Sequence, residues 1–357
     1  YNRFVALNEV GGNPASFGTS IESFSQFLAE RNRTMPKSLN AASTHDTKRG
    51  EDTRHRLTTI SEVPDRWEEF VNNVSVICDP FRSDNVPDRN IEYLFYQNLV
   101  GAWPISVERM VGAIQKSMRE AKVYTSWTHI NKEYEDGVVR FVEGAMESAE
   151  VRKLVEGFVD VVALPGWQRS LAASVLRITA PGIPDIYQGS ELWNHSLVDP
   201  DNRGIPDFAL RHELLKRVRA AVEKGNYNAM YQEWETGLPK LFVLHQALAT
   251  RSAHPDAFDP APDGTPADLD MITIEGGHRR NYLGFVRGGS VATILRRFHV
   301  SPQTDATIEV PKGTWHDVLS GGKFQGGKTG VSEILGPNKS NNQPSIRPVA
   351  LLVRQQS

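Results

Sequence analysis

The stretch Ser43-Thr44-His45-Asp46-Thr47-Lys48-Arg49 places a histidine, a carboxylate and two cations within five consecutive positions. It follows a run, residues 38 to 43, that predicts one short buried strand, and it precedes a helix predicted from Glu51 to Ile60. In a barrel of alternating strands and helices, the ends of the strands form the catalytic rim. His45 and Asp46 are therefore candidate catalytic residues. A second interpretation, in which Asp46 only caps the helix, fits the spacing equally well.

A metal centre is the other chemistry that a His-Asp pair can indicate. Metal-dependent phosphohydrolases with such a pair need an earlier metal-binding histidine, and no histidine precedes His45. Nine residues separate His45 from His55, which matches no common ligand spacing. We therefore expect no metal and no other cofactor.

Two further polar segments lie near residue 190. The segment Gly182-Ile-Pro-Asp-Ile-Tyr-Gln-Gly-Ser-Glu191 predicts a strand at 183 to 187 with a carboxylate beyond it, although a buried strand with a turn is the simpler interpretation. The segment Asp199-Pro-Asp-Asn-Arg203 predicts a turn. Its Asp and Arg could also hold a rim loop through an ion pair.

Aromatic residues are dense in residues 95 to 104 and 122 to 127. Aromatic rings stack on the faces of sugars, but aromatic residues at helical spacing belong to a hydrophobic core more often. The spacing alone leaves both interpretations open.

The composition limits the classes of partner. The chain has 357 residues, enough for two domains or for one large barrel with an appendage. Its 40 cations and 43 anions are spread along the sequence, which predicts no nucleic-acid partner and no anionic membrane surface. One cysteine and the lack of a run of about 20 apolar residues predict a cytoplasmic protein without disulfides or membrane spans.

Helices dominate the first two thirds of the sequence. Apolar residues at helical spacing predict helices at 20–33, 65–77, 90–103, 106–121, 131–164, 167–179 and 208–222. From about Leu238 alternating apolar runs at 282–286, 290–295, 306–310 and 348–353 predict a small antiparallel β domain. The segment from His254 to Asp270 is rich in Pro and Asp and predicts a loop.

Six short segments stand out along the chain: Leu7-Asn-Glu-Val-Gly-Gly12, Ser43-Thr-His-Asp-Thr-Lys-Arg49, Leu99-Val-Gly-Ala-Trp-Pro104, Thr125-Ser-Trp127, Pro184-Asp-Ile-Tyr-Gln-Gly189 and Val198-Asp-Pro-Asp-Asn-Arg203. Their order is the specific signal, because each is short. Taken together, they resemble the maltooligosyl trehalose synthases, a glucan-rearranging branch of the α-amylase family. The sequence departs from the family pattern at Gly204-Ile205, where a basic residue followed by Pro or Val is usual.

This resemblance implies an α/β fold: the C-terminal part of a (β/α)8 TIM barrel with a large helical insertion, followed by an antiparallel β-sandwich domain. The implied segments are residues 1–60 with the His-Asp strand, 61–165 as the helical insertion, 166–235 with the last barrel strand and helix, and 236–357 as the β-sandwich. The chain begins at Tyr1 without a methionine. We therefore expect a partial chain whose partner is the missing N-terminal half of the same enzyme.

The resemblance also implies the chemistry. His45-Asp46 is similar to the fourth signature region of the α-amylase family, so Asp46 would be its third catalytic carboxylate and His45 would assist it. The family's nucleophile and general acid would lie outside this chain. The substrate would be a maltooligosaccharide, contacted by Lys48, Arg49, Tyr187 and Glu191. The alternatives are another glucan hydrolase or transferase of the α-amylase family and a non-catalytic glucan-binding fragment.

Overall fold

The computed structural model describes residues 4–301, 303–338 and 345–355. These residues form two compact units, each built from separate segments of the chain. The first unit comprises Tyr1–Phe17, Ser43–Gly166 and Asn194–Gly204, and the second comprises Gly18–Ala42, Trp167–Trp193 and Ile205–Ser357. Within the described part of the chain, no helix has both the length and the apolar character that a membrane span requires.

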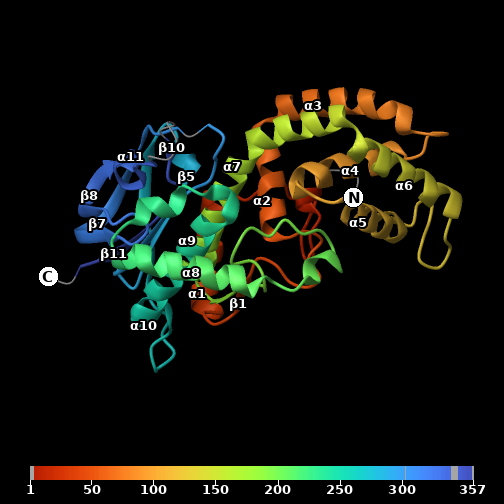
Figure 1. The fold of residues 1–357 in the computed structure, drawn as a ribbon. Coiled ribbons are helices and arrows are strands. Elements are labelled where there is room, and N and C mark those ends of the chain that lie inside the picture. Colours follow the sequence, from red (N-terminus) through yellow and green to blue (C-terminus); the bar gives the residue numbers. More distant parts are fainter. Residues whose placement is uncertain (1–3, 302, 339–344, 356–357) are drawn as a thin grey trace. The chain divides into compact units, whose positions relative to one another are not determined.

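Helices form nearly all of the first unit (Figure 1). Side chains at their N-termini explain where several of them begin: Asp88, Ser106 and Asn131 each accept a hydrogen bond from a backbone N–H of the following first turn. The α-helices are α2 Glu51–Thr59, α3 Pro64–Cys78, α4 Arg89–Ala102, α5 Val107–Ala121, α6 Lys132–Glu147 and the first half of α7 Ala149–Thr179; the short 3₁₀ helices are η1 Val5–Leu7, η2 Ile60–Glu62, η3 Asp79–Phe81 and η4 Asp201–Arg203.

Aromatic residues fill much of the core of this unit. The rings of Trp67 and Phe70 stack 5.3 Å apart, and Phe158 lies 5.0 Å from Phe70. Phe95 and Tyr96 of α4 are fully buried in the same core. For these two residues the core interpretation is therefore confirmed, and neither is available to stack on a sugar.

The pattern from residue 131 to 164 is wrong as a single helix. Ser148 adopts an extended conformation between α6 and α7, and its hydroxyl accepts a hydrogen bond from the N–H of Val151 at 3.3 Å, so it caps a new helix. The predicted break between a helix ending at residue 164 and another beginning at residue 167 is also wrong, because α7 continues through Pro165 to Thr179. A proline removes one helical hydrogen bond, which a well-packed helix tolerates.

The second unit contains the two strands expected from the sequence. β1 Leu39–Ala41 pairs in parallel with β2 Ile183–Asp185, in the register Leu39↔Ile183 to Ala41↔Asp185. The prediction that residues 38 to 43 and 183 to 187 form neighbouring parallel strands is confirmed, although each strand has only three residues. The expected burial is wrong, because the first and third residues of both strands are exposed. Gly182 permits this close approach: its φ is +126°, and a Cβ there would lie 2.6 Å from the carbonyl oxygen of Ser38.

Helices and an antiparallel sheet complete the second unit (Figure 1). The helices are α1 Ile21–Thr34, α8 Phe208–Glu223, α9 Leu238–Ala253, α10 Pro255–Phe258 and α11 Val331–Leu335, with η5 Tyr227–Tyr231, η6 Trp234–Thr236 and η7 Arg279–Asn281. The main sheet has seven strands in the order β3-β5-β6-β11-β7-β4, with β8 also paired to β7. They are β3 Leu269–Met271, β4 Thr273–Gly276, β5 Tyr282–Arg287, β6 Val291–Arg296, β7 Ala306–Asp317, β8 Lys323–Gly330 and β11 Val349–Arg354; β9 Pro337–Asn338 pairs separately with β10 Ser345–Ile346.

The strands predicted from the alternating apolar runs are present as β5, β6, β7 and β11, but those runs predict no helix after Leu238. α9 occupies that region because its apolar residues recur at helical rather than alternating spacing, and ten of its residues are buried. The structure therefore establishes a chain of mixed helix and sheet. The closure of a (β/α)8 barrel, the β-sandwich and the four segment boundaries remain predictions.

Candidate functional site

The candidate site lies on a tight turn at residues 44 to 47, in the first unit. The hydroxyl of Thr44 accepts a hydrogen bond from the N–H of Asp46 at 3.2 Å. The carbonyl oxygen of Thr44 accepts two more, from the N–H of Thr47 at 3.3 Å and from its hydroxyl at 2.8 Å. The N-cap of α2 is Gly50, and no side chain caps that helix. The interpretation of Asp46 as a helix cap is therefore wrong.

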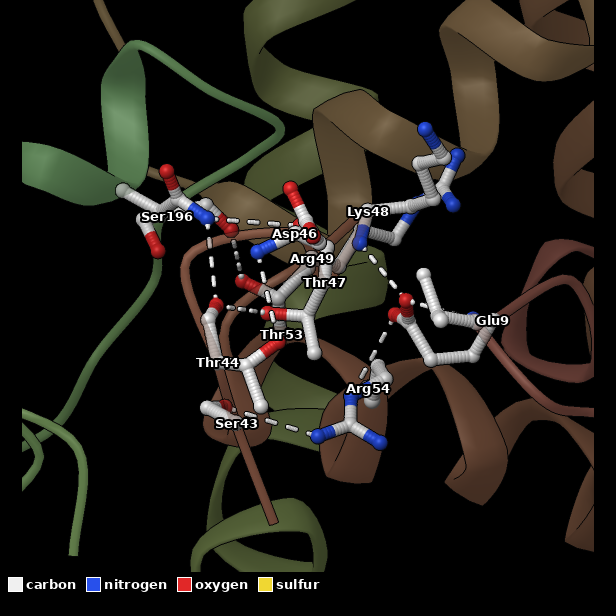
Figure 2. A network of polar contacts seen from close by, with 12 residues as sticks. Glu9, Ser43, Thr44, Asp46, Thr47, Lys48, Arg49, Thr53, Arg54 and Ser196 are labelled. Carbon is white, nitrogen blue, oxygen red and sulfur yellow. Dashed lines mark hydrogen bonds and ion pairs between the residues drawn. The ribbon is translucent and has the colours of Figure 1, made fainter. Parts of the chain in front are cut away.

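His45 and Asp46 stand next to each other on the outside of this turn. Nε2 of His45 lies 3.2 Å from Oδ2 of Asp46, and the two side chains are 63% and 65% exposed. Figure 2 shows Asp46 among the side chains of the turn and its neighbours. Because most of both side chains is free of protein contact, a ligand could bind to the carboxylate and to the imidazole ring.

Lys48 and Arg49 follow the turn in a more enclosed environment. Nζ of Lys48 lies 3.4 Å from Oε2 of Glu120, and Nε of Arg49 donates to Oδ1 of Asn98 at 3.0 Å. Arg49 is only 4% exposed. Both residues line a small pocket, together with Asn98, Ala113, Ser117, Glu120, Leu197 and Val198.

Glu9 holds the chain directly after the turn, a role that the sequence analysis did not assign to it. Its Oε1 accepts a hydrogen bond from the N–H of Lys48 at 2.7 Å and from the N–H of Val10 at 3.0 Å. Its Oε2 lies 3.7 Å from Nε of Arg54, whose Nη2 lies 3.5 Å from the hydroxyl of Ser43 (Figure 2). The only signal in the sequence was that Glu9 belongs to the motif Leu7–Gly12, and a motif does not show which residue Glu9 contacts.

Asn202, from the segment 199 to 203, holds the turn from another side. Its Nδ2 lies 3.1 Å from the carbonyl oxygen of His45, 3.3 Å from that of Thr47 and 3.5 Å from that of Thr44. Asn202 is 6% exposed. The predicted turn at 199 to 203 ends in η4, and the predicted ion pair within this segment is present, between Asp199 and Arg203. The contact with the turn at 44 to 47 is made by the amide of Asn202.

A second segment, residues 194 to 196, closes around the start of α2. The carbonyl oxygen of Ser196 accepts hydrogen bonds from the N–H of Gly50 at 2.9 Å and from the hydroxyl of Thr53 at 3.2 Å. The carboxylate of Asp52 accepts one from the N–H of Asn194 at 2.6 Å. These contacts fix the beginning of α2 directly behind the candidate site.

We expect Gly50→Ala to destabilise the protein by about 2 kcal/mol, because a Cβ at this position would lie 2.5 Å from the carbonyl oxygen of Asn194. Chemical denaturation followed by circular dichroism measures the loss. Gly112→Ala in α5 is the matched control, since nothing lies within 4 Å of its Cβ position. That variant should gain up to about 1 kcal/mol. Equal stabilities for the two variants would contradict the packing described at Gly50.

Several known proteins are similar to this chain over almost its whole length. No family model matches the chain. A curated protein of Mycobacterium tuberculosis, described as a maltooligosyl trehalose synthase, is 33% identical over 99% of this chain, which covers 42% of that relative. The maltooligosyltrehalose synthase structure from Arthrobacter ramosus is 34% identical, with a TM-score of 0.86 over 99% of this chain and 43% of that chain. A hypothetical maltooligosyl trehalose synthase from Sulfolobus tokodaii is 28% identical, with a TM-score of 0.78, over 99% of this chain and 44% of that one.

The resemblance to maltooligosyl trehalose synthase is confirmed. The chain spans about two fifths of the length of the synthases that it matches.

Two of the synthase motifs serve mainly to pack the helices. Leu99 and Val100 are buried, and Gly101 touches α2, since a Cβ there would lie 2.9 Å from the side chain of Leu57. The hydroxyl of Thr125 donates to Oε1 of Glu135 at 2.6 Å. Hydrogen bonds from Arg119 lower the pKa of Glu135, so this carboxylate is charged. Trp127 instead stays 55% exposed, with Arg119 over its ring.

Tyr187 and Glu191 belong to the second unit and are described only within it. Tyr187 is half-buried, and its carbonyl oxygen accepts a hydrogen bond from the N–H of Ser190 at 3.0 Å. Oε2 of Glu191 accepts a hydrogen bond from Nε of Arg211 at 3.0 Å, and Nη2 of Arg211 donates to the carbonyl oxygen of Gly189 at 2.8 Å. Arg211 thus fixes the turn that carries Glu191.

Among the described residues, no group of three or more His, Cys, Asp or Glu side chains could hold a metal ion.

Arg56 is a buried cation of the first unit. Burial lowers its pKa to about 10, and Asp52 partly opposes that shift. Arg56 remains charged at neutral pH and donates to the carbonyl oxygen of Trp103 at 2.6 Å.

Proposed function

We propose that these residues are the C-terminal part of a maltooligosyl trehalose synthase and carry the third catalytic carboxylate of its site, Asp46. The observation that carries the proposal is the pairing of His45 and Asp46, both exposed, on a turn whose backbone is held by the buried Asn202 and the partly buried Glu9. The remaining residues of a synthase of the relatives' full length supply the nucleophile and the general acid. The enzyme is then a (1→4)-α-D-glucan 1-α-D-glucosylmutase.

The proposed reaction moves the reducing-end glucose of a maltooligosaccharide from an α-1,4 to an α,α-1,1 linkage within one molecule. The nucleophile displaces that glucose and forms a covalent glycosyl-enzyme, while the general acid protonates the departing oxygen. The freed glucose turns over in the site. Its anomeric hydroxyl then attacks the glycosyl-enzyme, loses its proton to the same residue now acting as a base, and gives net retention.

Within this reaction Asp46 binds hydroxyl groups of the glucosyl unit that is transferred, through hydrogen bonds that strengthen as the ring approaches an oxocarbenium ion. His45 donates a hydrogen bond to the neighbouring hydroxyl and orients Asp46. Lys48 reaches the sugar on the acceptor side, and Arg49 lines the pocket beside it. Tyr187 and Glu191 complete the proposed set of substrate contacts.

The proposal includes the finer architecture. β1 and β2 are adjacent strands of a (β/α)8 barrel, residues 61–165 are a helical insertion, and residues 236–357 form a β-sandwich domain. The parallel pairing of β1 with β2 supports the barrel, because parallel strands joined by helices are its repeating unit. The insertion forms a wall of a closed pocket that retains glucose and excludes water.

Incubation of the full-length enzyme with maltopentaose tests the function. The synthase reaction lowers the reducing power of the solution while releasing little glucose. An increase in reducing ends would identify a glucan hydrolase of the same family, and binding without turnover would identify a glucan-binding protein. Either result would contradict the proposal.

A further inference from the structure

Asn202 makes contacts that the motifs did not indicate, and they concern the backbone that carries the candidate catalytic pair. The side chains of His45 and Asp46 are mostly exposed, and within the described residues the carboxylate of Asp46 has one ion-pair contact, with His45. Side-chain packing therefore fixes neither residue. Their orientation depends on the path of the main chain through residues 44 to 47.

The side-chain amide of Asn202 lies against that path. Its two N–H groups face the carbonyl oxygens of His45 at 3.1 Å and Thr47 at 3.3 Å, with that of Thr44 at 3.5 Å. All three neighbours accept hydrogen bonds, so the nitrogen of the amide, and not its oxygen, must face them. Oδ1 of Asn202 accepts no hydrogen bond from the described residues. The amide thus acts as a donor to one turn.

Asn202 is itself held on a rigid support. It lies in η4, directly after Asp201 and three residues after Asp199, and these two acidic residues bind cations of α5. Asp201 accepts hydrogen bonds from Arg109 at 2.6 and 2.9 Å, and Nζ of Lys116 donates to the carbonyl oxygen of Asp199 at 2.8 Å. A bidentate pair of this kind restricts both distance and orientation. Contacts with α5 therefore fix η4, and Asn202 of η4 fixes the turn at residues 44 to 47.

We infer that Asn202 is a positioning residue, which holds the turn 44–47 so that Asp46 meets the transition state in the correct orientation. This inference rests on the proposed role of Asp46. A displacement of about 1 Å in a catalytic group can lower turnover about 100-fold, whereas ground-state binding through other contacts changes little. Loss of the amide should therefore act on kcat and leave KM almost unchanged.

The test uses the full-length synthase with maltohexaose. We expect Asn202→Ala to lower kcat roughly 30-fold or more with KM within about threefold, and Asn202→Ser, which keeps a short donor, to fall between it and the wild type. Thermal unfolding shows whether each variant is folded at the assay temperature. If the alanine variant is unfolded there, the serine variant alone is used for the test. Asn73→Ala, at an exposed position of α3, is the control and should not change kcat.

A double-mutant comparison separates positioning from general damage. Asp46→Glu keeps a carboxylate but misplaces it, so Asn202→Ala added to it should cost less than about threefold if Asn202 acts through Asp46. A full additional loss, or a kcat of Asn202→Ala within threefold of the wild type, would overturn the inference. If Asp46→Glu itself leaves kcat unchanged, the proposed function of Asp46 fails instead, and the two failures are distinct.

Discussion

Replacing Asp46 with Asn in the full-length enzyme should lower kcat by three to four powers of ten, with a much smaller change in KM. The substitution keeps the size of the side chain but removes the charge that would face a developing oxocarbenium ion. A loss of about 4 to 6 kcal/mol of transition-state stabilisation gives an effect of this size. Initial rates of loss of reducing power from maltohexaose, at several concentrations, measure both constants.

The structure makes this a test of chemistry and not of folding. Asp46 is 65% exposed and does not cap α2, so the folded state loses little when its charge is removed. Asp65→Asn, an exposed carboxylate in the first turn of α3, is the matched control and should retain wild-type kcat. A kcat for Asp46→Asn within tenfold of the wild type would remove Asp46 from the catalytic set.

The sequence was informative wherever a residue's neighbours along the chain determine its structure. Helices α3, α4, α5 and α8 were predicted to within one or two residues, because apolar spacing and capping residues act locally. α9 was missed because the whole region after Leu238 was predicted to be β structure, from the alternating apolar runs that follow this helix. The junction at Ser148 was missed because one capping hydroxyl outweighs a continuous apolar pattern.

The candidate site was predictable in its exposed part only. His45 and Asp46 follow from a two-residue motif after a strand, and the family resemblance gave them roles. Glu9 and Asn202 lie 39 and 155 positions from their main-chain partners at Lys48 and Thr47, and no local rule connects such positions. Both residues hold backbone groups, so their function depends on a geometry that only the folded chain provides.

The 357-residue chain by itself should have no synthase activity. Transfer with retention requires a nucleophile and a general acid about 5 Å apart across the glycosidic bond, and Asp46 cannot serve as both. Nearby carboxylates in the first unit are already engaged: Glu9 binds the N–H of Lys48, and Glu120 faces its ammonium group. Asp52 binds the N–H of Asn194, and Asp201 binds Arg109.

This prediction is checked by mixing the purified chain with maltohexaose and following both reducing power and the appearance of a non-reducing product. We expect neither to change, because hydroxyl binding by His45, Asp46 and Lys48 has no covalent step to assist. Weak binding of maltohexaose, detected by the quenching of Trp fluorescence, remains compatible with inactivity. The informative control is Asp46→Ala in the same chain. If the unmodified chain turns the substrate over and the Asp46→Ala variant does not, the activity cannot come from a contaminating enzyme. A nucleophile and a general acid would then both lie within these residues. The assignment of Asp46 as the third carboxylate alone would be wrong.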